Sequence, residues 1–107
     1  MIWKIIHTEN ADQDLEKTRE YIRDVLQEPE TAKKQVARIL KAISSLDHFP
    51  LRYRIYEYEP WRSRGIRVLP VDNYLAFYWP DETRNVVEIL HILYGGRDLA
   101  AQWEPED

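Results

Sequence analysis

The stretch YLAFYWPDETRNVVEILHILY, residues 74–94, decides the fold. Its first part, residues 74–79, alternates between two faces, which is the period of a β-strand. Residues 80–85 are polar and carry the turn signals of a hairpin loop, and residues 86–94 are rich in strand-forming Ile, Leu and Val. The stretch therefore predicts two antiparallel strands joined by a short connection.

Apolar residues at spacings of three and four predict two amphipathic helices upstream. The first begins at Thr8 or Asn10 and runs to about Gln27, where Pro29 stops it, and the second covers residues 31–46. Because the connection between them is short, the two helices should form an antiparallel hairpin. Their apolar stripes contain Ala11, Leu15, Thr18, Ile22 and Val25, and then Ala32, Val36, Ile39, Leu40, Ile43 and Leu46.

Two further strands complete the predicted fold, at residues 2–7 and 64–70. The order strand, helix, helix and three consecutive strands indicates one α+β domain over residues 1–107, with an antiparallel meander and the helices on one face of the sheet. The first strand is expected at an edge or beside a middle strand. The secondary structure of residues 51–63 is not assigned from the sequence, because their alternation favours a strand whereas Pro60 and the two flanking glutamates favour a loop. Residues 98–103 predict a short helix or an ordered tail.

Composition excludes several classes of protein. The chain of 107 residues and 12.9 kDa has the size of one domain, and it contains no cysteine, which excludes disulfides and cysteine-ligated metals. No apolar stretch is long enough for a membrane span or a signal peptide, so a cytoplasmic location is expected. Three glycines cannot build a phosphate loop, and His7, His48 and His91 lack the spacing of metal ligands. Neither a metal nor a cofactor is predicted.

The net charge of −4, with a pI of about 5.4, argues against a general nucleic-acid binder. The arginines are nevertheless clustered, and only Glu57 and Glu59 oppose them locally. The cluster consists of Arg52, Arg54, Arg62, Arg64 and Arg67. The planar guanidinium of arginine can bind a phosphate through two hydrogen bonds, and aromatic rings can stack on bases. The second half of the chain could therefore supply an RNA site. The same side chains could equally form a core or a solvated strand face.

Several short segments, in their order and spacing, resemble the RelE/ParE superfamily of bacterial type II toxins. The resemblance covers residues 2–100 and is carried by Ala11-x-x-Asp14-Leu15, Tyr21-Ile22, Phe49-Pro50, Arg64-Gly65-Ile66-Arg67, Tyr74-Leu75-Ala76-Phe77-Tyr78 and Ile89-Leu90-His91-Ile92-Leu93-Tyr94-Gly95-Gly96-Arg97-Asp98-Leu99. It implies a toxin neutralised by a cognate antitoxin. One branch of the superfamily cleaves mRNA on the ribosome, and the other poisons DNA gyrase without RNase activity.

The resemblance also implies roles for individual residues. Arg67 and Arg97 would contact the scissile phosphate with help from Arg64, Tyr94 or His91 would act as acid or base, and Trp103 would stack on a base where the RNase branch has a tyrosine. Leu75 stands where that branch has an arginine. The sequence therefore leads to ribosome-dependent mRNA cleavage, with gyrase inhibition or an inactive relative as alternatives. Candidates for an exposed antitoxin-docking patch are Trp3, Tyr53, Tyr56, Tyr58 and Trp61.

Overall fold

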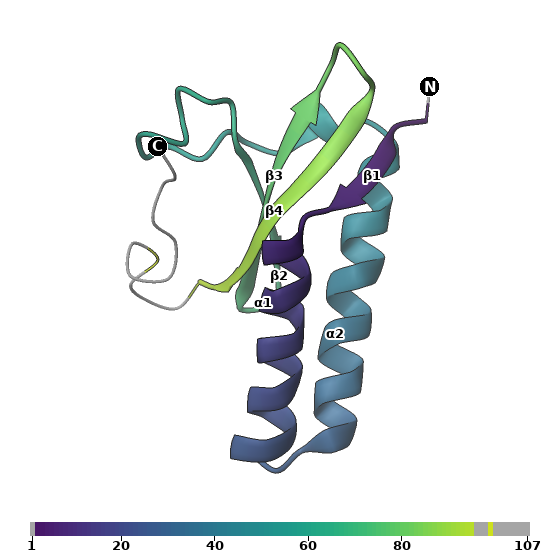
Figure 1. Ribbon diagram of the computed structural model, residues 1–107, viewed down its shortest axis with the longest axis vertical. Helices are drawn as coiled ribbons and strands as arrows, with labels where there is room; N and C mark the ends of the chain where they lie inside the picture. Colours follow the sequence, from purple (N-terminus) through teal and green to yellow (C-terminus); the bar gives the residue numbers. More distant parts are fainter. Residues whose placement is uncertain (1, 96–98, 100–107) are drawn as a thin grey trace.

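A computed structural model of the chain describes residues 2–95 and Leu99. Two helices cover one face of a four-stranded sheet, and the fold is α+β as predicted (Figure 1). The elements in chain order are β1 (Lys4–His7), α1 (Glu9–Glu20), the π-helical turn η1 (Tyr21–Val25), α2 (Pro29–Ser44), the 3-10 turns η2 (Ser45–Asp47) and η3 (Pro50–Arg52), β2 (Arg67–Val71), β3 (Tyr74–Asp81) and β4 (Val86–Tyr94).

The strand order is β1-β4-β3-β2, so the predicted meander is present and β1 lies at one edge. β1 runs parallel to β4, from Lys4 opposite Val86 to His7 opposite Ile89, whereas the other pairs are antiparallel. Thr8 links helix α1 to strand β4. Its hydroxyl oxygen accepts the Ala11 amide as the N-cap of α1, and it also donates to the Ile89 carbonyl of β4 at 2.7 Å.

Two hydrophobic clusters lie on the two faces of the sheet. The larger one packs α1 and α2 against the sheet and contains Ala11, Ile39, Ile43, Leu46, Leu69, Ala76, Tyr78, Val87, Ile89 and Ile92. The smaller one contains Tyr56, Ile66, Val68, Phe77 and Leu93. Tyr56 comes from the segment that sequence reasoning left open. Residues 56–66 are therefore neither a strand nor a free loop but cover the second face of the sheet through Tyr56, Trp61 and Ile66, and one bridge joins Ile55 to Arg67.

Two elements, α2 and β2, begin at other residues than the sequence predicted, and each difference has a local cause. Pro29 begins α2 at its first turn, where a missing amide costs nothing, instead of only ending α1. The second strand, β2, begins at Arg67 instead of residue 64, because Arg64 and Gly65 lie in a turn and Gly65 has a φ of +75°. Except for Leu99, residues 98–103 of the predicted tail lie outside the described residues.

The hairpin between β3 and β4 is closed by the carboxylate of Asp81. Its oxygens accept Arg84 Nε at 2.6 Å and the amide and hydroxyl of Thr83 at 3.1 and 2.7 Å. The Arg84 guanidinium, followed by the Thr83 hydroxyl, lowers the pKa of Asp81 to about 2. This side chain is buried, so its charge depends on these donors.

We expect the stability of the protein to fall with pH below about 4, where an Asp in an unfolded chain takes up its proton. The folded carboxylate keeps its charge down to about pH 2, so the stabilisation by Asp81 is complete above the unfolded pKa and is lost as the pH falls through the folded one. Urea unfolding between pH 2 and pH 5 measures this slope. Asp81→Asn should flatten it, and a variant with the wild-type slope would show that Asp81 does not carry it.

Candidate functional site

The edge of β4 is closed by a carboxylate from α1. β1 ends at His7, so β4 has no strand partner on that side beyond Ile89. There, Asp14 Oδ2 accepts the Ile92 amide at 2.9 Å and the Nδ1 of His91 at 2.8 Å. Both side chains of this pair are largely buried. Because an ionised carboxylate can only accept, Asp14 fixes the proton of His91 on Nδ1.

A β-bulge accounts for the position of His91. Phe77 of β3 pairs with His91 whereas the next residue, Tyr78, pairs with Ile89, so Leu90 is the additional residue in β4. Next to this bulge, Asp14 accepts the hydrogen bond of the Ile92 amide, which has no strand partner in β1. Sequence reasoning did not single out this role of Asp14. The signal was available, since Asp14 lies three residues after Ala11 and four before Thr18, both of which are buried on the inner stripe of α1.

Arg67 lies on the other side of the sheet from His91. Its direct partner Tyr78 packs in the cluster beneath the helices, whereas Phe77, the partner of His91, packs in the opposite cluster. Directly paired residues share a face and successive residues alternate, so Arg67 and His91 belong to different faces. The Arg67 guanidinium donates to the carbonyls of Leu51 and Tyr53 at 3.1 and 2.6 Å. It anchors the chain that follows α2.

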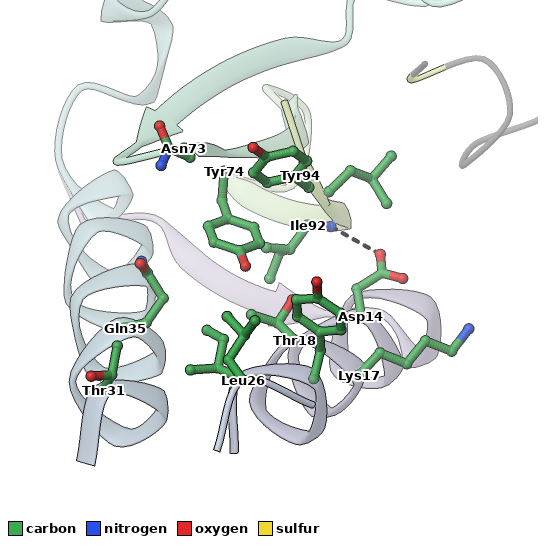
Figure 2. A pocket seen from close by; sticks show the side chains of 13 residues that line it. Asp14, Lys17, Thr18, Leu26, Thr31, Gln35, Asn73, Tyr74, Ile92 and Tyr94 are labelled. Carbon is green, nitrogen blue, oxygen red and sulfur yellow. Dashed lines mark hydrogen bonds between the residues drawn. The ribbon is translucent and has the colours of Figure 1, made fainter. Parts of the chain in front are cut away.

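Tyr94 lies at the end of β4, where an open groove of about 970 Å³ begins (Figure 2). Its ring stacks edge-on against Tyr74 with 5.8 Å between the centroids, and its side chain is half exposed. Burial raises the pKa of Tyr74. The groove runs between the helical hairpin and the end of the sheet and is lined by Asp14, Lys17, Thr18, Tyr21, Ile22, Leu26, Thr31, Gln35, Asn73, Tyr74, Ile92, Leu93 and Tyr94.

Arg64 lines a second, shallower hollow of about 400 Å³ together with Trp61, Ile66, Trp79 and Leu90. Ile66, Trp79 and Leu90 belong to the cluster on the face away from the helices, so this hollow and the groove open on different faces. Leu75 packs in the same cluster, close under Gly95. At the position where the RNase branch has an arginine, this chain has a core residue.

The four described candidates therefore occupy separate places. Arg67 holds backbone on the helix side, His91 is held by Asp14 at the β4 edge, Tyr94 borders the groove, and Arg64 lies at the hollow on the opposite face. Arg97 and Trp103 lie outside the described residues. Among the described part of the chain, no group of His, Asp and Glu is arranged to hold a metal ion. The helices of that part are too short or too polar to cross a membrane.

The residues expected in the docking patch differ in exposure. Tyr56 is buried in the smaller cluster, so the prediction was wrong for this residue. Trp3 and Tyr53 are partly buried against the larger cluster, and Trp61 is partly buried against the smaller one. Only Tyr58 is exposed. The amphipathic pattern could not distinguish aromatic residues that cover the second face of the sheet from aromatic residues on the surface.

Exposed apolar side chains occur instead at the tip of the hairpin, on Tyr21, Val25 and Leu26. The helical stripe had placed Val25 inside. The π-helical turn explains the difference, because the Leu26 amide bonds the Tyr21 carbonyl five residues back. The wider turn rotates the following residues away from the α-helical stripe.

Comparisons with known proteins agree with this architecture. Residues 5–99 match the family model described as the ParE toxin of the type II toxin–antitoxin system parDE. A chain from the chromosomal ParDE system of P. aeruginosa has the same fold, with a TM-score of 0.73 and 23% identity over 87% of this chain and 96% of that one. A chain of the RelBE2 toxin–antitoxin complex of Mycobacterium tuberculosis matches with a TM-score of 0.62 and 21% identity, over 88% and 99%.

No curated protein matches the sequence significantly. The family model nevertheless spans most of the chain, from β1 to Leu99, and both structures share its helical hairpin and sheet. The chain therefore belongs to the ParE toxin family of type II toxin–antitoxin systems.

Proposed function

We propose that this toxin arrests growth by binding a protein target and not by cleaving RNA. DNA gyrase is the target implied by the resemblance to the RelE/ParE superfamily. The observation that carries the proposal is the separation of Arg67 and His91 on opposite faces of the sheet, each held by a group of the protein itself. A binding protein can use such residues structurally, whereas a nuclease needs them at one phosphate.

RNA cleavage requires three tasks at one point. The 2′-hydroxyl must lose its proton, the phosphate charge must be stabilised, and the leaving oxygen must be protonated. The Arg67 guanidinium already donates hydrogen bonds to the carbonyls of Leu51 and Tyr53. The Nδ1 of His91 is hydrogen-bonded to the Asp14 carboxylate. Neither arrangement places a cation and a base against a common substrate position.

Ribosome-dependent mRNA cleavage is the second candidate, and the hollow around Arg64 favours it. Arginine beside Trp61 and Trp79 offers a cation next to aromatic rings, the combination that holds unstacked bases. Tyr94 adds a half-exposed hydroxyl at the end of β4. If this candidate is right, Arg64→Gln and Tyr94→Phe should abolish cleavage while leaving the fold intact.

We further propose that the cognate antitoxin docks in the groove of about 970 Å³. Its lining combines the apolar side chains of Leu26 and Ile92 with the charged side chains of Asp14 and Lys17 (Figure 2). This combination suits an amphipathic helix that inserts apolar side chains and exposes its polar face. Tyr21 and Leu26, both exposed at the tip of the hairpin, line this groove and extend its apolar surface to the solvent.

A supercoiling assay with purified gyrase and purified toxin tests the proposed function. The toxin alone should inhibit supercoiling, and addition of the antitoxin encoded beside it should restore the activity. The antitoxin alone is the control. Undisturbed supercoiling at a molar excess of folded toxin would contradict the proposal, and cleaved mRNA in a translation reaction would then support the second candidate.

A further inference from the structure

The corner between α2 and β2 displays an aromatic ring from a strained backbone. Phe49, the residue before η3, has φ 49° and ψ 54°, in the left-handed region. Its side chain is 78% exposed. Bulky residues rarely adopt this conformation, and the residue before a proline is normally extended. Glycine or asparagine would adopt it with less strain, and neither would leave an apolar ring in water.

The strain is imposed by a set of side chains that bind the carbonyls of this corner. Arg52 donates to the carbonyls of His48 and Phe49, the latter at 3.1 Å. The buried Tyr78 hydroxyl donates to the Pro50 carbonyl at 2.6 Å, and Arg67 holds the next part of the corner through Leu51 and Tyr53. Donors from η3, β2 and β3 thus hold the backbone that carries the ring. Strain that is fixed by its surroundings in this way is typical of functional sites.

The surface next to Phe49 is apolar and positive. Leu51 and Ile55 are both exposed. Arg52 and Arg54 are exposed between them, while the carboxylate of Asp47 is bonded to His48 at 2.7 Å. An aromatic anchor with cationic neighbours fits an apolar pocket whose rim carries acidic residues.

We propose that Phe49 is a preorganised anchor with which the toxin binds an acidic-rimmed apolar pocket of its protein target. This inference rests on the proposed function, since it assumes a protein target. The anchor lies beyond the C-terminal end of α2, whereas the groove assigned to the antitoxin reaches Thr31 at the other end of that helix. Gln35 is the groove residue nearest to the C-terminal end of α2, and the helix rises about 14 Å from Gln35 to Ser44. Target and antitoxin would thus use different parts of the toxin.

The test is Phe49→Gly, which removes the ring and relieves the strain together. We expect a higher melting temperature, unchanged antitoxin binding, and growth arrest that needs about tenfold more toxin or is lost, as for an interface hot spot. Phe49→Tyr should retain growth arrest. Tyr58→Ala, which removes another exposed aromatic ring, is the matched control and should arrest growth as the wild type does.

Three results would overturn the inference. Growth arrest by Phe49→Gly at the wild-type dose would exclude an anchor, a lower melting temperature would make Phe49 a structural residue, and weakened antitoxin binding would assign it to the antitoxin. Growth arrest reports on any target. A wild-type toxin that leaves gyrase active but cleaves mRNA would therefore refute the proposed function through a different readout.

Discussion

Replacement of Asp14 by alanine should lower the free energy of unfolding by about 2–4 kcal/mol, as expected when two buried donors lose a charged acceptor. The Ile92 amide and the His91 ring nitrogen both depend on the same oxygen of Asp14, at 2.9 and 2.8 Å. No strand of the described sheet can replace it, because β1 stops at His7. Urea unfolding monitored by far-UV circular dichroism measures the loss.

Asp12→Ala is the matched control, since Asp12 lies in the same helix and is exposed. It should change stability by less than about 0.5 kcal/mol, as surface substitutions usually do. Asp14→Asn should fall between the two, because the amide oxygen can accept both donors in place of Oδ2 but lacks the negative charge that strengthens these hydrogen bonds. An Asp14→Ala protein as stable as the control would refute the role of this carboxylate at the β4 edge.

Replacement of Leu26 by aspartate should weaken antitoxin binding by about 100-fold, on the order of 3 kcal/mol. Leu26 lines the groove but is half exposed, so the free toxin can hydrate the new carboxylate and stay folded. A docked helix would bury the charge without a partner. Isothermal titration of toxin with antitoxin measures the change, and cells that express both proteins should stop growing.

Val25→Asp is the neighbouring control. Val25 is more exposed than Leu26, at 65% against 48%, and it does not line the groove. It should leave the affinity within about threefold of the wild type, which is the range of surface substitutions. Equal effects of the two substitutions would argue against the groove as the docking site.

The sequence predicted the parts of the fold that depend on local pattern. The alternation of residues 74–79 and the helical stripe of Ile39 and Ile43 correspond to β3 and to the inner face of α2. The parallel pairing of β1 with β4 and the cover of the second face by Tyr56 depend on contacts between distant residues. Neither of them has a local signature.

The candidate site was harder to predict for the same reason. Residue type made Arg67 a candidate for the phosphate and His91, like Tyr94, a candidate acid or base, and only strand register shows that Arg67 and His91 belong to opposite faces. Val25 was misplaced because a π-helical turn changes the phase of the stripe without any characteristic residue. Phe49 offered no pattern at all, since a positive φ at phenylalanine results from the donors around it.

The proposal that this ParE-family toxin binds a protein target instead of cleaving RNA can be tested in a cell-free translation reaction. Folded toxin is added and the mRNA 5′ ends are mapped. We expect the same ends with and without toxin. New ends that depend on ribosomes and disappear with Arg97→Ala would contradict it and would place Arg97 in a nuclease site.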